Sequence, residues 1–385
     1  MSGTRSMDRI FTACHGTQLL VIQHLRLHLG LPPAREYLLW NPLDNAPTID
    51  AFMRDVIAGA GFDDVLDIRD FEQLKPRTQG PAAWWFESAR RLRHDERRLR
   101  SWLLGNRIDP QAVELWTDDP IHFNVVFPKA CLRHALHVKF PHSFNLDDSG
   151  AGDYRRGLED ARRRVSWAKR MLFVPWLRAV SGCDLSAKRS MTYDVAYTFD
   201  RPSPWSERSI DVSRLISLRH FGDTFRSLPS TLKQDVESAL APIRTSRKPL
   251  LLLLLFGLSA PLRHAYQTAL TRIYADAQRR FDGGTLVIKV HPGPNGGEEE
   301  ELHAWARANL SAPVFAIRSP VNLELILDEL RPDFVLAGPC GALPVLHRLR
   351  MGQPMVLPEI MDELCRAFPH DRRSYRQLVE GMPVC

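Results

Sequence analysis

The sequence lacks the cysteine patterns that mark disulfide-rich or zinc-binding proteins. Its 6 cysteines are scattered, and no two of them form a Cys-x-x-C pair. We therefore predict neither a disulfide framework nor a structural zinc site, and this cysteine usage best fits a reducing cytoplasm.

Long apolar runs are absent as well. The longest, from Pro249 to Phe256, has 8 residues, whereas a helix that spans a bilayer needs roughly 20. The apolar run that begins at Ile10 is too short and too broken for a signal peptide. The sequence therefore predicts a soluble, cytoplasmic globular protein.

A complete Gly-x-Gly-x-x-Gly motif is missing after the first predicted strand. That strand, Arg9 to Cys14, leads through His15-Gly-Thr17-Gln18 into an apolar helix. A strand, a glycine turn and a helix open a mononucleotide-type unit, but without the full motif dinucleotide binding is not predicted. The second half has no Asp-x-Asp at a strand end, so we expect neither a metal site nor a cofactor.

The length of 385 residues and the 44% hydrophobic share predict two globular domains. Periodicity weakens between residues 181 and 248, and Ala241 to Pro249 has the composition of a linker. We place an N-terminal domain at 1–240 and a C-terminal domain at 249–385.

Apolar strand patterns alternate with helical patterns in both predicted domains. The predicted strands are Arg9 to Cys14, Glu36 to Trp40, Asp64 to Ile68, Val113 to Trp116, His137 to Phe140, Leu250 to Phe256, Leu286 to Val290, Val314 to Ile317, Phe334 to Ala337 and Met355 to Leu357. This alternation is typical of a parallel sheet with helices on both faces. The predicted fold class is therefore α/β, with two doubly wound, Rossmann-like domains.

Positive charge is concentrated in two blocks, although the net charge is only +6. The first comprises Arg90, Arg91, Arg93, Arg97, Arg98, Arg100 and Arg107, and the second Arg155, Arg156, Arg162, Arg163, Arg164, Lys169, Arg170 and Arg178. The second block alternates with tryptophan and aliphatic residues, a pattern typical of segments that bind an anionic polymer or lie on anionic lipid. This pattern predicts an anionic glycan, or the inner face of the cytoplasmic membrane, as a partner. A solvated helix face is the alternative interpretation, and neither block has a nucleic-acid motif.

The stretch Gly284 to Gly297 joins a β-branched strand to a His-Pro pair and a glycine-rich loop. Pro292 cannot donate a ladder bond, so His291 is predicted at the carboxyl end of a buried parallel strand. Ligands of open α/β sheets bind at that edge, and Gly293 lets backbone amides approach a phosphate. The alternative is a structural histidine in an ordinary strand-to-helix turn.

Two further loops follow strands of the same predicted sheet. Gly257-Leu-Ser259 follows the leucine-rich strand, and Gly338-Pro-Cys340-Gly341 follows Phe334 to Ala337. Because parallel strands end at one edge, these loops are predicted to hold a nucleotide through their amides and the following helix N-termini.

A pair of carboxylates stands on a glycine-rich loop in the first half. Asp147 and Asp148 precede Gly150. Of two adjacent carboxylates, one is typically oriented by hydrogen bonds, while the other can act as a base or a metal ligand. A plain turn is the alternative, since aspartate and glycine favour turns. We interpret the pair Asp118-Asp119, after Trp116, as a turn.

These features resemble the bacterial sialyltransferase and polysialyltransferase families, which are GT-B enzymes with two Rossmann-like domains facing a central cleft. The resemblance covers the architecture of nearly the whole chain and rests on the Asp-Asp loop, the His291-Pro292 pair and the small-residue loop at Gly338. It implies an inverting, metal-independent glycosyltransferase that moves sialic acid, or a related CMP-activated sugar, to a glycan hydroxyl in capsule or lipooligosaccharide synthesis.

The resemblance also implies roles for particular residues. By position, Asp148 is the catalytic base with Asp147 beside it, Gly150 lets the acceptor approach, and His291 contacts the departing CMP. Thr17 and Gln18 lie on the acceptor side. The loop residues Pro292, Gly293, Gly257, Ser259, Gly338, Cys340 and Gly341 form the nucleotide site.

Two departures from the family pattern stand out. Ser149 is inserted before Gly150, which leaves the choice between the two aspartates open, and Cys340-Gly341 replaces the usual hydroxyl motif. Other interpretations are a CMP-Kdo transferase, a CDP-polyol phosphotransferase, a nucleotide-sugar epimerase, or a non-catalytic nucleotide-sugar-binding protein.

Overall fold

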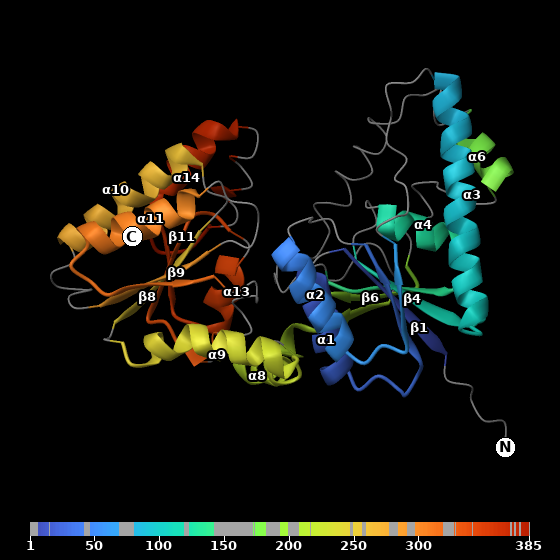
Figure 1. The fold of residues 1–385 in the computed structure, drawn as a ribbon, viewed down its shortest axis with the longest axis horizontal. Coiled ribbons are helices and arrows are strands. Elements are labelled where there is room, and N and C mark those ends of the chain that lie inside the picture. Colours follow the sequence, from blue (N-terminus) through green and yellow to red (C-terminus); the bar gives the residue numbers. More distant parts are fainter. Residues whose placement is uncertain are drawn as a thin grey trace. The chain divides into compact units, whose positions relative to one another are not determined.

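The computed structural model divides the chain into two compact units, which are described separately (Figure 1). The first contains 1–43 and 60–215, and the second 44–59 and 216–385. The structure describes residues 7–14, 16–41, 47–68, 81–118, 123–141, 172, 174–181, 193–198, 208–215, 217–246, 249–255, 259–276, 284–290, 297–318, 327, 329–340, 342–369, 372, 375–376 and 379–384.

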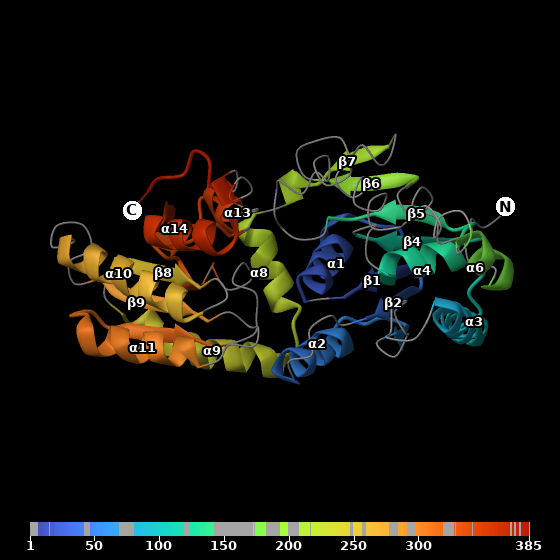
Figure 2. The same ribbon diagram turned by 90° about the horizontal axis from the view of Figure 1, so that it is seen from above.

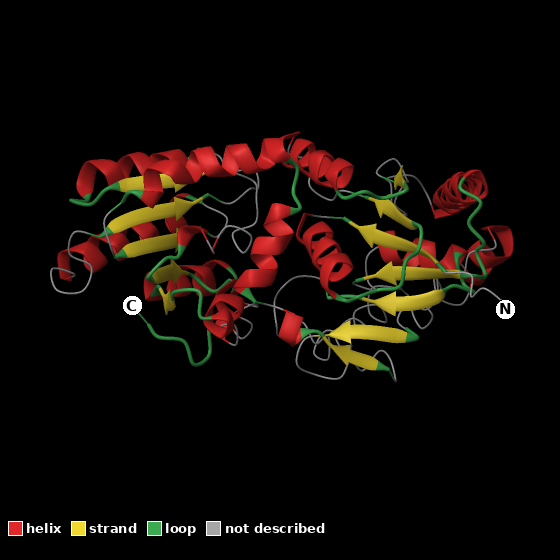
Figure 3. Ribbon diagram, turned by 90° about the horizontal axis from the view of Figure 1, so that it is seen from below, coloured by secondary structure: helices red, strands yellow, loops and turns green. Residues whose placement is uncertain are grey.

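The first unit contains a parallel sheet of seven strands in the order β3-β2-β1-β4-β5-β6-β7. The strands are β1 (Asp8–Ala13), β2 (Glu36–Trp40), β3 (Asp64–Asp67), β4 (Val113–Thr117), β5 (Leu136–Lys139), β6 (Val195–Thr198) and β7 (Ser209–Asp211). Every pairing is parallel, so the arrows of this sheet point the same way (Figure 3).

Helices cover both faces of this sheet. They are α1 (Gly16–His28), α3 (Pro81–Gly105), α4 (Phe123–Cys131) and α6 (Val174–Ser181), with a 3₁₀ turn, η2 (Ser213–Leu215), near the end of the unit. Leu92, Leu99 and Leu103 of α3 pack on Ile10 and Leu115 of the sheet, while α1 lies against the opposite face (Figure 2). Burial on both faces explains why consecutive residues are apolar in the middle of these strands, as in Ile10-Phe11 of β1 and Tyr37 to Trp40 of β2.

A buried arginine joins the amino ends of three neighbouring strands. Arg9 of β1 is 3% exposed and contacts Glu36 of β2 at 3.1 Å and Glu114 of β4 at 2.9 Å. The register pairs Arg9 with both glutamates. These charge-assisted bonds hold the strands in that register.

The second unit contains a parallel sheet of five strands in the order β10-β9-β8-β11-β12. The strands are β8 (Leu250–Leu254), β9 (Thr285–Lys289), β10 (Val314–Ile317), β11 (Phe334–Ala337) and β12 (Gln353–Val356). The helices are α2 (Pro47–Gly59), α8 (Leu218–Arg226), α9 (Ser230–Arg244), α10 (Ala260–Asp276), α11 (Glu298–Asn309), α13 (Ala342–Leu349) and α14 (Pro358–Ala367).

The core of the second unit lies on the face of the sheet that α10, α11 and α14 cover. Leu251 and Leu253 of β8 pack there with Tyr266 of α10, Leu302 of α11 and Ile360 of α14. The helices α9 and α13 lie on the other face (Figure 1). Successive leucines of β8 point to opposite faces of the sheet. Because helices cover both faces, every position of the strand is apolar.

Both sheets are doubly wound. If strands are numbered along each unit, the two orders begin 3-2-1-4-5, and the winding reverses between the first and fourth strands. The predicted fold class, α/β with two Rossmann-like units, is confirmed.

The region with weak periodicity is more regular than its pattern indicated. It contains β6, β7, α8 and α9, and the first part of the predicted linker, Ala241 to Arg244, belongs to α9. Residues 216–248 group with the second unit, whereas the sequence placed the boundary at 240. The domains 1–240 and 249–385 stay a prediction.

Candidate functional site

The three strands that precede the loops predicted for nucleotide binding, β8, β9 and β11, are neighbours in the second sheet. Leu254 of β8 stands in register with Lys289 of β9 and with Ala337 of β11. The strands therefore end at one level, and β8 and β11 flank the reversal point where ligands of open α/β sheets bind. The segments that follow begin at Leu255, Val290 and Gly338.

The loop after β11 is closely packed. Gly338 is buried, and a Cβ at this position would lie 2.5 Å from Cγ2 of Ile360 in α14. Packing of α14 therefore accounts for this glycine. Cys340 is half-buried, its carbonyl accepts from the Leu343 amide at 3.2 Å, and α13 begins at Ala342.

The helix α10 begins at the same edge. Ser259 is exposed directly before the helix, and its carbonyl accepts from the Arg263 amide at 2.8 Å. The Arg263 guanidinium contacts Glu298 at 2.6 Å and also contacts Glu301, both in the first turn of α11. This pairing connects the amino ends of α10 and α11, where acidic side chains also favour the helix dipole.

A lysine that the sequence analysis did not select lies at the same edge. Lys289, the last residue of β9, is 7% exposed, and its Nζ donates to the Val290 carbonyl at 3.1 Å. The ammonium group therefore lies beside the residue that precedes His291. A positive charge at a strand end is suited to a phosphate ligand, and Lys289 could have been noticed as the one charge in the apolar run Thr285 to Val290.

Several predicted site residues lie outside the described residues. They are Asp147, Asp148, Gly150, Gly257, His291, Pro292, Gly293 and Gly341. Their assignment remains a prediction. Of the nucleotide-site residues, Ser259, Gly338 and Cys340 are described, and all three follow strands that end at the common edge.

Thr17 and Gln18, which were predicted on the acceptor side, lie at the reversal point of the first sheet, in the first turn of α1. Gln18 is fully buried, its Oε1 accepts from the Cys14 amide at 2.6 Å, and its Nε2 donates to Oδ2 of Asp118. Asp118 directly follows β4. Gln18 thus joins the ends of β1 and β4, the two strands between which the winding reverses.

Asp118 was predicted as part of a turn. The chain does bend there, but the Asp118 side chain is fully buried and hydrogen-bonded. The Tyr193 hydroxyl donates to its carbonyl at 3.3 Å and accepts from Oγ1 of Thr117 at 3.2 Å. Because β4 ends at the reversal point, this aspartate belongs to the polar edge of the sheet and is more than a surface turn residue.

A buried lysine completes this polar group. Lys129 of α4 is 1% exposed, and its Nζ lies 3.5 Å from the centroid of the Tyr193 ring. Burial lowers the pKa of the Lys129 ammonium to about 7, and Asp194 acts in the opposite direction. The sequence analysis did not select Lys129, because in sequence it is only a polar residue in an apolar helix. Such perturbed groups are enriched at functional sites but also occur in structural networks.

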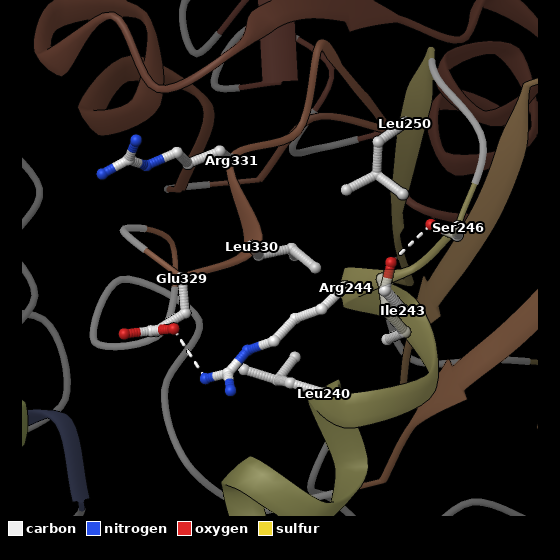
Figure 4. A pocket seen from close by; sticks show the side chains of 8 residues that line it. All are labelled: Leu240, Ile243, Arg244, Ser246, Leu250, Glu329, Leu330 and Arg331. Atoms are coloured by element: carbon white, nitrogen blue, oxygen red, sulfur yellow. Dashed lines mark hydrogen bonds and ion pairs between the residues drawn. The ribbon is translucent and has the colours of Figure 1, made fainter.

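A cavity of the second unit lies at the opposite edge of its sheet, where β8 begins (Figure 4). It has a volume of about 230 Å³ and is lined by Leu240, Ile243, Arg244, Ser246, Leu250, Glu329, Leu330 and Arg331. Figure 4 shows the Arg244 guanidinium directed toward Glu329, and the two groups are 2.6 Å apart. Since ligands of such sheets bind at the carboxyl ends of the strands, this cavity is separate from the candidate site.

Two further features concern metals and membranes. Within the described ranges, no three His, Cys, Asp or Glu side chains are grouped to hold a metal ion. In the same part of the chain, no helix has the length and apolar character required to cross a bilayer.

Comparison with known proteins identifies similar architectures. No family model and no curated protein sequence matches the chain. Among solved structures, the UDP-GlcNAc 2-epimerase from Neisseria meningitidis, bound to UDP-GlcNAc, has 9% identity and a TM-score of 0.47 over 98% of this chain and 95% of that one. A UDP-glucosyltransferase from Polygonum tinctorium has 14% identity and a TM-score of 0.47 over 94% and 83%. The UDP-GlcNAc 2-epimerase from Methanocaldococcus jannaschii has 10% identity and a TM-score of 0.46 over 91% and 84%. Values this low establish neither the activity nor the substrate of this chain.

Proposed function

We propose that this chain is a GT-B-type enzyme that binds a nucleotide sugar at the carboxyl edge of its second sheet. The observation that carries the proposal is the common level at which β8, β9 and β11 end. Leu255, Val290 and Gly338, which follow these three strands, therefore start at one level beside the reversal point, and the proposal assigns Ser259, His291 and Gly338 to the nucleotide on this basis. Such an edge offers loop amides and helix N-termini to a phosphate.

Charge at this edge supports a phosphate-bearing ligand. The buried Lys289 ammonium lies at the end of β9, next in sequence to the segment of His291. In the proposed complex, Lys289 and His291 offset the charge that develops on the departing nucleotide, together with the dipole of the following helix. This arrangement requires no metal ion.

The reaction we propose is an inverting transfer of sialic acid, or a related sugar, from a CMP donor to a glycan hydroxyl. Asp148, with Asp147 beside it, removes the proton of the acceptor hydroxyl as its oxygen attacks the anomeric carbon, and the bond to CMP breaks. The acceptor meets the first unit near Thr17 and Gly150. The buried contact of Gln18 with Asp118 positions the turn after β1 on which this side of the site depends. We place the enzyme in the cytoplasm.

Calorimetric titration of CMP, UDP and their sugar conjugates tests the binding site. We expect the protein to bind CMP and its conjugates more tightly than UDP, and His291→Ala and Lys289→Met each to weaken binding by about 10- to 100-fold, because each removes a charge-assisted contact. Lys233→Met, which removes a lysine of α9, is the matched control. Unchanged affinity in both variants would place the nucleotide elsewhere.

Product analysis tests the reaction. With a CMP sugar and a glycan acceptor, we expect a glycoside of inverted anomeric configuration and free CMP. A donor whose sugar has changed configuration without transfer would identify an epimerase. Binding with neither transfer nor slow donor hydrolysis would identify a non-catalytic binding protein, and either result would overturn the proposed transfer.

A further inference from the structure

The helix α3 presents an exposed stripe that the proposed reaction does not use. Along one face it carries Phe86, Arg90, Arg93, Arg97, Arg100 and Leu104, all exposed. Their spacings of 4, 3, 4, 3 and 4 residues place them in one line, since residues three or four apart share a helix face. At about 1.5 Å per residue, the stripe is roughly 27 Å long.

The opposite face of α3 fixes which side is exposed. Ala89, Leu92, Leu99 and Leu103 are buried against the first sheet, and α3 is the long cyan helix of Figure 1, with α6 beside its first half. Trp176 of α6 contacts Phe86 edge to face, with ring centroids 5.9 Å apart. That contact lies at the first residue of the stripe, whereas the buried leucines hold the opposite face of α3, so the arginines face outward.

The charge on the stripe has one sign. The exposed residues described in α3 include no carboxylate: Asp95 is buried, while Glu87 and Glu96 are half-buried and pair with Arg91 and Arg100. A solvated helix face normally mixes both signs.

The spacing of the arginines is itself unfavourable for an isolated helix. Arg90 and Arg93 are three residues apart, Arg93 and Arg97 four, and like charges at four-residue spacing destabilise a helix.

The apolar ends of the stripe identify the kind of partner. Phe86 is 72% exposed and Leu104 is 78% exposed. A polyanion in water contacts arginines but gives such side chains nowhere to bury their surface, whereas a bilayer offers both anionic headgroups and hydrocarbon.

We infer that the outward face of α3 is a docking surface for an anionic lipid bilayer, with the arginines on the headgroups and Phe86 and Leu104 at the boundary of the hydrocarbon. The sequence pattern favoured the block 155–178 for this role, but most of that block lies outside the described residues. The inference does not depend on the proposed reaction.

Vesicle co-sedimentation tests this inference. The wild-type protein should bind vesicles of phosphatidylcholine mixed with phosphatidylglycerol, should not bind phosphatidylcholine alone, and should be released by high salt, because salt screens the charges. The triple variant Arg90→Glu/Arg93→Glu/Arg97→Glu should bind roughly 100-fold more weakly or worse.

The matched control is Arg214→Glu/Arg219→Glu/Arg307→Glu, which changes the net charge equally at exposed positions outside α3. It should keep more of the vesicle binding than the stripe variant. Equal losses in the two triple variants would show that net charge alone governs binding, and would overturn the inference. Thermal melts of both variants check that each remains folded.

A second variant separates a membrane from a soluble polyanion. Phe86→Ser/Leu104→Ser keeps every arginine, so it should lower vesicle binding while leaving retention on heparin unchanged. Wild-type protein that binds heparin but not anionic vesicles would assign the stripe to a polyanion and would overturn the membrane inference.

Discussion

Replacing the buried Lys129 with methionine should make the protein more stable near neutral pH and should flatten the dependence of stability on pH. Lys129 is 1% exposed, and burial lowers its pKa from 10.5 to about 7. Methionine has a similar length and no charge. The substitution also removes a cation–π contact, because the Lys129 ammonium lies 3.5 Å from the centroid of the Tyr193 ring. Such a contact contributes about 1–2 kcal/mol when it is desolvated.

The sign of the pH effect follows from proton counting. Between about pH 7 and pH 10.5 the unfolded chain keeps the Lys129 proton while the folded chain has released it. The unfolded state then binds more protons, so stability rises with pH over this window. At pH 7 the pKa difference corresponds to a penalty of about 4 kcal/mol, and by pH 9 this falls by about 2 kcal/mol.

Urea denaturation followed by tryptophan fluorescence measures this effect, since most tryptophans belong to the first unit. At pH 7 Lys129→Met should be more stable than the wild type by about 2–3 kcal/mol, which is the penalty less the lost ring contact. This advantage should shrink by about 2 kcal/mol at pH 9. Lys233→Met is the reference for removing a lysine that is not fully buried. If the advantage stays constant across this range, Lys129 keeps its proton in the folded protein and the reasoning is wrong.

Three other changes test the register, the packing and the chemistry. Arg9→Ala leaves Glu36 and Glu114 without their shared arginine and should lower the free energy of unfolding, measured in urea, by about 3–5 kcal/mol. The control Arg35→Ala breaks the more exposed pair with Asp8 and should cost about 1 kcal/mol or less. Similar losses in the two variants would refute the role of burial. Gly338→Ala would put a Cβ 2.5 Å from Ile360 and should cost about 1–3 kcal/mol, while Gly105→Ala, with no neighbour within 4 Å, should show no loss from crowding. Asp148→Asn should lower kcat by about 10²- to 10⁴-fold with CMP affinity unchanged, and Asp147→Asn should cost less unless Ser149 shifts the loop and exchanges their roles; full activity in both variants would remove the aspartates from the mechanism.

Local patterns were sufficient for most strands of the two sheets. The predicted ranges for β2, β10 and β11 match the structure at both ends, because short apolar runs bounded by turn residues carry a strong local signal. The strands β6 and β7 were missed. They are 4 and 3 residues long, and β7 lies at the sheet edge with Asp211 exposed, so burial imposes little apolar pattern on it.

The candidate site, too, was predicted from the sequence only in part. The sequence predicts that a loop follows each of three strands in the second unit. Because these strands are parallel and in register, the segments after them start at one edge of the sheet. The contacts of Lys289 and of Gly338 with Ile360 were not predicted, because both depend on which side chain packs against which.

The sequence by itself determined the alternation of strands and helices, and with it the two doubly wound units, because hydrophobic periodicity is a local property. It also contained the spacing of the stripe from Phe86 to Leu104. Only the tertiary structure decided that this stripe faces outward, since that depends on where α3 buries its leucines. The same holds for Gln18 with Asp118, which are 100 residues apart, and for Lys129 with Tyr193: chain reversal and packing bring such groups together, and no local pattern records the pairing.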